Sequence, residues 1–201
     1  MHINVWDTGA VGDGSTDNTA AIQKAFDIVR NAGGGVVFIP AGRYVTKANL
    51  MVGSNTVVQG AGWKQTILAP DPRSEVARPL LVGTDPCPYG PSNHVTIRDL
   101  QVDGGDPKLY RQGIAIVGGS NYVTIERCWL RNLGMYGIMA GDVNKVEPFA
   151  GGLHGIVIRG NHVDMTGAKL VYNGREAVCS PIGIEVFAKG SNGYNSTPGV
   201  L

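Results

Sequence analysis

The sequence predicts an all-β fold, a single-stranded parallel β-helix that follows one α-helix at about residues 17–32. Three blocks of similar sequence begin at Asn93, Asn121 and His154, so their offsets are 28 and 33 residues. A second motif, Gly-Ile-x-apolar, recurs at residues 113–116, 137–140 and 183–186. No heptad or long helical face follows residue 33. Short strands at a fixed repeat, each unable to bury its own inner face, predict stacked coils.

Each repeat contains the pattern Val-x-Ile or Ile-x-Ile, as in Val95-Thr96-Ile97. Side chains alternate between the two faces of a strand, so the first and third residues should point inward and the middle one outward. β-Branched side chains pack well on such a surface. We therefore expect Val95, Val123 and Ile156 to lie above one another in a shared interior.

The predicted helix follows a loop rich in Gly and Asp. Thr16 or Asp17 can act as its N-cap, and apolar residues then fall at helical spacing. Three consecutive glycines should end it, because glycine adopts the left-handed conformation readily. The apolar face consists of Ile22, Ala25, Phe26 and Val29, and the glycines are residues 33–35.

Composition excludes several classes of function. Charged residues make up only 16%, against about 25% in an average domain, and the 30 glycines indicate many tight turns. A net charge of +1 does not predict nucleic-acid binding, and no apolar run is long enough for a membrane span. The N-terminal residues do not form a signal peptide. Three cysteines match no zinc or redox pattern, and Cys128 is expected to be buried in a strand.

Residues 9–23 and 33–44 resemble the signature of pectate-lyase-like β-helix proteins of the rhamnogalacturonase/epimerase and phage tailspike type, and residues 60–62 and 97–100 also match. The resemblance implies a right-handed β-helix whose N-terminal mouth is capped by the helix. It also implies a polysaccharide partner and an extracellular or virion-associated protein. The expected activity is that of a polysaccharide lyase or glycoside hydrolase acting on an acidic or bacterial-surface glycan.

The chemistry of the family does not carry over. In the epimerase branch, the strand that matches Tyr136-Gly137-Ile138 is followed by the catalytic acid and histidine, but those positions hold Met139 and Gly141 here. The paired-Asp and Gly-His-Gly motifs of polygalacturonases are absent too. A non-catalytic glycan-binding or virion tail module therefore stays open as the alternative. A pair of outward acids about 5–10 Å apart would favour the enzyme, and an apolar outer wall together with a trimer would favour the module.

Individual residues give a provisional site. The Gly-Ile-x-apolar strands should place Ala115, Met139 and Glu185 in one outward column. The candidate catalytic residues are Glu185, Asp142, Lys145 and His154, and the candidate substrate-binding residues are Tyr136, Tyr110, Arg111 and Asp103. Each has an ordinary alternative, such as a solvated loop charge for Asp142 or a turn for Asp103. Trp129 should pack on a neighbouring coil. The metal is not specified, and Ca²⁺ is an option only if the chain is a lyase.

We expect residues 1–201 to form a single β-helix domain. Residues 190–201 do not resemble a cap, and an uncapped solenoid exposes apolar surface and strand edges. The sequence therefore predicts either that further C-terminal coils are missing or that another subunit covers this end, for example in a homotrimer.

Overall fold

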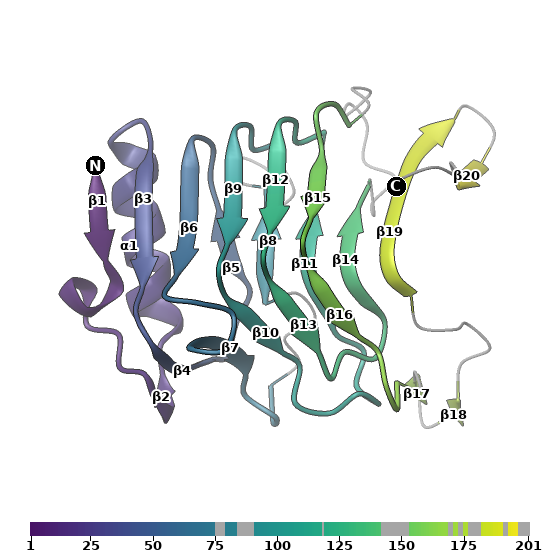
Figure 1. Cartoon of the computed structure of the whole chain (residues 1–201), viewed down its shortest axis with the longest axis horizontal. Helices are drawn as coiled ribbons and strands as arrows, with labels where there is room; N and C mark the ends of the chain where they lie inside the picture. The colour runs from purple at the N-terminus through teal and green to yellow at the C-terminus, as the bar shows by residue number, and fades with distance from the viewer. Residues whose placement is uncertain are drawn as a thin grey trace.

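A computed structural model of the chain describes residues 1–74, 79–83, 91–117, 119–141, 153–168, 171–172, 175–176, 182–190 and 193–196. Within these residues the strands form three long sheets, and each sheet runs along one side of a stack of coils (Figure 1). Strands of successive coils pair in parallel. The predicted right-handed parallel β-helix is confirmed.

The first sheet contains β1 (His2–Asn4), β3 (Gly35–Ile39), β6 (Thr56–Gly60), β9 (Val95–Arg98), β12 (Val123–Glu126) and β15 (Val157–Arg159). The second contains β2 (Asp13–Asp17), β4 (Gly42–Thr46), β7 (Thr66–Pro70), β10 (Gln101–Asp103), β13 (Trp129–Arg131) and β16 (His162–Asp164). The third contains β5 (Leu50–Val52), β8 (Leu80–Val82), β11 (Gln112–Ile116), β14 (Tyr136–Ala140), β19 (Ile182–Gly190) and the antiparallel β20 (Gly193–Ser196). A separate antiparallel pair joins β17 (Val171–Tyr172) and β18 (Arg175–Glu176).

The interior is built from the predicted columns. Val95 pairs with Val123 and Ile97 with Ile125, and all four side chains are fully buried. Ile156, one residue before β15, packs against the same core. Burial of aliphatic surface in such continuous columns is the main force that holds the coils together.

Helix α1 (Thr19–Asn31), after the short 3₁₀ helix η1 (Val5–Thr8), lies at the end of the stack that carries the N-terminus (Figure 1). Its predicted apolar face is buried against the β-helix core. The predicted ends need correction, because the N-cap is Asn18 rather than Thr16 or Asp17. The Asp17 carboxylate still accepts from the backbone N–H of Thr19 at 3.0 Å. Gly33, with φ of 83°, follows the helix as predicted.

The asparagines that begin the repeats hold one coil to the next. The side-chain oxygen of Asn93 accepts from the backbone N–H of Asn121 at 2.9 Å. The side-chain oxygen of Asn121 accepts in turn from the N–H of His154 at 2.8 Å. These bonds satisfy backbone donors at the turns and explain why two of the three repeats begin with asparagine. Among the described helices, none has the length and apolar character needed to cross a membrane.

Candidate functional site

The predicted outward column exists on the third sheet. Ala115 pairs with Met139, and Met139 pairs with Glu185, as the Gly-Ile-x-apolar motif predicts. Ala115 and Met139 are nevertheless fully buried. With Leu81 and Val117 they form an apolar cluster separate from the main core, here called the apolar wall. The expectation that this part of the column would be open to solvent is therefore wrong.

Glu185 lies where the apolar wall ends. Its side chain is half-buried, and its Oε2 atom is buried with no hydrogen-bond partner in the part of the chain that the structure describes. Burying a polar oxygen without a partner costs free energy, and such atoms in native structures call for an explanation. Glu185 therefore keeps its place as a candidate acid or base.

The remaining candidate catalytic residues do not gather around Glu185 in the described structure. His154 is exposed in the turn before β15, on the first sheet, and its backbone groups bond the turn of the preceding coil. Asp142 and Lys145 lie outside the described residues. Tyr136, at the start of β14, packs against the apolar wall, and Tyr110 is exposed in the loop before β11.

Arg111, a predicted sugar ligand, is buried in the structure. Its side chain is 2% exposed and donates to the carbonyl oxygens of Asp71 and Ser74 at 2.9 and 3.0 Å, and to that of Gly104 at 2.5 Å. The guanidinium thus joins two loops from neighbouring coils. Arg111 therefore has a structural role, and its buried side chain is not available to bind a sugar.

Asp103 is also largely buried, at the end of β10. Its carboxylate accepts from Arg43 at 3.0 Å, Arg131 at 3.2 Å and Asn132 at 2.8 Å. Burial acts to raise the pKa of Asp103, but the hydrogen bonds from Asn132 and Arg43 outweigh it and hold the pKa below its usual value. Asp103 therefore fixes two arginines on the outer face of the second sheet.

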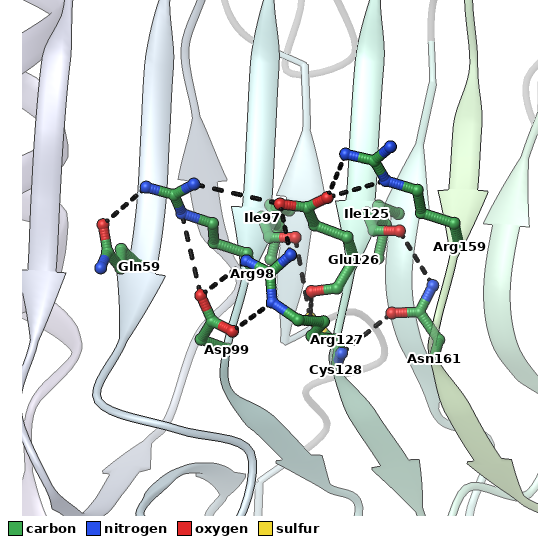
Figure 2. Close-up of polar contacts among 10 residues, drawn as sticks. All are labelled: Gln59, Ile97, Arg98, Asp99, Ile125, Glu126, Arg127, Cys128, Arg159 and Asn161. Carbon is green, nitrogen blue, oxygen red and sulfur yellow. Dashed lines mark hydrogen bonds and ion pairs between the residues drawn. The ribbon is translucent and has the colours of Figure 1, made fainter.

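An arginine ladder that sequence reasoning missed runs along the outer face of the first sheet (Figure 2). We use this name for Arg98, Glu126 and Arg159, together with Asp99 and Arg127. The first three occupy one register column. Glu126 accepts from Arg159 Nε at 2.9 Å and lies 2.9 Å from Arg127 Nη1 and 3.9 Å from Arg98 Nη1.

Further hydrogen bonds join members of the ladder to one another and to Gln59. Arg127 donates to both carboxylate oxygens of Asp99, at 2.7 and 3.0 Å, and Arg98 donates to Gln59 at 3.0 Å. The Arg159 hydrogen bond lowers the pKa of Glu126, and the Asp99 hydrogen bond raises the pKa of Arg127. The sequence signal was available, because Arg98, Glu126 and Arg159 hold the same position in the three repeats.

Three aromatic rings gather on the outer face of the second sheet. Trp63, from the turn before β7, lies 5.4 Å from Trp129, and His162 lies 5.8 Å from Trp129 and 6.3 Å from Trp63, between ring centroids. We call these three residues the ring cluster. Trp129 thus packs against residues of neighbouring coils, as predicted.

The described residues contain no group of three or more His, Cys, Asp or Glu side chains placed to hold a metal ion. Cys128 is buried as predicted, and burial raises the pKa of its thiol to about 12. Ca²⁺ binding, which is expected only if the chain is a lyase, stays a prediction.

Comparison with known proteins agrees with the fold. Residues 2–87 match a family described as rhamnogalacturonase A/epimerase, pectate lyase-like. The A-module of mannuronan C-5 epimerase AlgE4 from Azotobacter vinelandii superposes with a TM-score of 0.60 at 25% identity, covering 80% of this chain and 50% of that one. Residues 2–87 thus carry the signature of this family, and the described fold is that of the pectate-lyase-like β-helix superfamily.

Two further proteins resemble the chain, one in sequence and one in fold. Alginate lyase 7 from Azotobacter vinelandii is 35% identical over 153 residues, which span 68% of the chain but 17% of that enzyme. The tailspike protein of E. coli bacteriophage HK620, solved in complex with a pentasaccharide, superposes with a TM-score of 0.64 at 16% identity, covering 92% of this chain and 33% of that one. The chain therefore spans only part of each of these proteins.

Proposed function

We propose that this β-helix is a polysaccharide-binding module that holds its glycan without cleaving it. The proposal assigns to the chain the ligand class named for its relatives, an alginate lyase, a mannuronan epimerase and a tailspike with a bound pentasaccharide. Fold alone does not fix chemistry, so the decision rests on the residues.

The observation that carries the proposal is the apolar wall. In the epimerase branch, the positions after the stretch that matches Tyr136-Gly137-Ile138 hold the catalytic acid and histidine; here they hold Met139 and Gly141, both buried. Met139 packs with Leu81, Ala115 and Val117. A lyase or epimerase needs a base close to C5 of the uronic acid and a group that stabilises the developing negative charge. Buried aliphatic side chains supply neither.

The test follows binding and chemistry in the same samples. The chain is incubated with sodium alginate, polygalacturonate and dextran, and its mobility is measured by affinity electrophoresis. New double bonds, new reducing ends and uronate composition are measured in parallel. We expect retardation by at least one polymer without any product. Unchanged mobility in all three, or a product made by the wild-type chain, would overturn the proposal.

Catalysis is the second candidate, and it is favoured by the buried Oε2 of Glu185, which has no hydrogen-bond partner among the described residues. In that role Glu185 would act as general acid or base at the end of the outward column. A product that wild-type protein forms and Glu185→Gln does not would support this alternative. Asp27→Asn, which changes a half-exposed carboxylate on α1, is the matched control and should leave any activity unchanged.

Location and assembly extend the proposal. The likeness to a phage tailspike supports a virion-associated or extracellular module. A homotrimer stays a prediction, which light scattering of the purified chain tests directly.

A further inference from the structure

The ring cluster exposes a large apolar ring beside fixed polar groups. Trp63 is 41% exposed although Trp129 and His162 pack beside it. Tryptophan offers a large, rigid apolar surface that dominates the energetics of many interfaces. An exposed ring held in place by its neighbours is ready to bind without a large loss of conformational entropy.

Strand pairing in the second sheet holds Trp129 and His162 in place. Trp129 follows Gln101 in register on the second sheet, and His162 follows Trp129. The indole Nε1 of Trp129 is buried and has no hydrogen-bond partner in the described part of the chain. A buried indole N–H normally has a partner, so packing alone does not account for this arrangement.

Cationic groups surround the rings. Lys64 Nζ lies 5.2 Å from the Trp63 ring centroid, and the Arg131 guanidinium lies 4.9 Å from the Trp129 ring centroid. Arg131 is held by Asp103, which also holds Arg43. Positive charge beside an apolar ring suits a ligand with one apolar face and negatively charged or hydroxyl substituents at its edge.

We propose that the ring cluster is a sugar-binding site in which a pyranose unit stacks on Trp63. One face of a pyranose ring consists of C–H groups and packs against the indole, while its edge presents hydroxyl or carboxylate oxygens toward Lys64. The cations favour a carboxylate-bearing sugar over a neutral one. This inference rests on the proposed function and places the binding on the second sheet, away from the apolar wall and from Glu185.

Trp63→Ala tests the site, because the side chain stands in a turn and its removal should leave the coils folded. The matched control is Trp6→Ala, which removes another exposed indole, at the N-terminal end of the stack. Affinity electrophoresis in alginate and in dextran measures binding, and circular dichroism checks the fold. We expect Trp63→Ala to weaken binding at least about tenfold and Trp6→Ala to change it less than about twofold.

The outcomes separate this site from the proposed function. If wild-type protein binds alginate and Trp63→Ala binds equally well, the site is wrong and the function stands. If wild-type protein binds none of alginate, polygalacturonate and dextran, both fall. Concentration-dependent self-association that Trp63→Ala abolishes would make the face a protein interface and would also overturn the site. Lys64→Gln should weaken binding to alginate and leave binding to dextran unchanged. If Lys64→Gln binds alginate as tightly as the wild-type protein does, the acidic sugar is removed from the proposal.

Discussion

The outer faces of the first and third sheets are built by the same coils, yet they carry opposite chemistry. On the first sheet the outward column is the arginine ladder, where Glu126 contacts Arg98, Arg127 and Arg159 (Figure 2). On the third sheet the outward column contains the buried side chains of Ala115 and Met139. The inward columns of both sheets are aliphatic and belong to one core.

The difference teaches where the fold constrains the sequence and where it does not. Inward positions must be apolar because each coil buries its inner face only against its neighbours. Outward positions are free to be charged, aromatic or apolar, so recognition of a ligand has to be sought there. The following predictions test this contrast, from the largest expected effect to the smallest.

Met139→Asp should be the most damaging change, because it places a carboxylate inside the apolar wall. Burying an unpaired charge costs several kcal/mol, so we expect a loss of roughly 4 kcal/mol or more in the free energy of unfolding, measured in urea. The reverse exchange on the charged face, Arg98→Met, should cost much less. Equal losses would mean that the two walls do not differ as described.

Ile125→Ala should cost about 2–5 kcal/mol, because it leaves a cavity in an inward column. Its neighbour Thr124 points outward on the same strand, so Thr124→Ala should change stability by less than about 0.5 kcal/mol. Urea unfolding of both variants measures the contrast between the two sides of β12. Similar losses at the two positions would contradict the inward and outward assignment.

Glu126→Gln should lower the free energy of unfolding by about 1–3 kcal/mol at neutral pH, because the carboxylate is covered by three arginines. The hydrogen bond from Arg159 lowers the pKa of Glu126 in the folded protein from an ordinary value of 4.5. The stability that it contributes is therefore present above about pH 4.5 and is lost as the pH falls through the lower folded pKa. Urea unfolding between pH 3 and 7 should give a shallower pH dependence for the variant; parallel curves would rule out this role.

The smallest effect concerns reactivity rather than stability. Because burial raises the pKa of the Cys128 thiol from 9.0 to about 12, its thiolate fraction at neutral pH should be lower by about a thousandfold. Alkylation at Cys128, followed by peptide mass mapping, should proceed only after unfolding. Rapid labelling of the native protein would show that the interior of this coil is open.

The sequence predicted the repeating architecture because inward positions follow a strict rule. Val95, Val123 and the column Ala115–Met139–Glu185 were all placed in the right register. Burial of the outward side chains was not predictable, because it depends on what covers a face rather than on strand alternation. Arg111 shows the same limit, since its carbonyl partners Asp71 and Ser74 lie far away in sequence.

The ring cluster was missed for a related reason. Trp63 comes from a turn outside the aligned repeats, and its approach to Trp129 depends on how that turn folds over the second sheet. Trp129 and His162 do share a repeat position, so two of the three residues of the cluster were visible as a pattern in the sequence. The expected start of α1 shifted for a local reason, because Asn18 takes the cap position next to Asp17.

The most direct test is a crystal structure of the chain with an alginate oligosaccharide. We predict a pyranose ring stacked on Trp63, with its carboxylate toward Lys64. A sugar bound instead at Glu185 on the third sheet would contradict the account and would return the chain to the catalytic class.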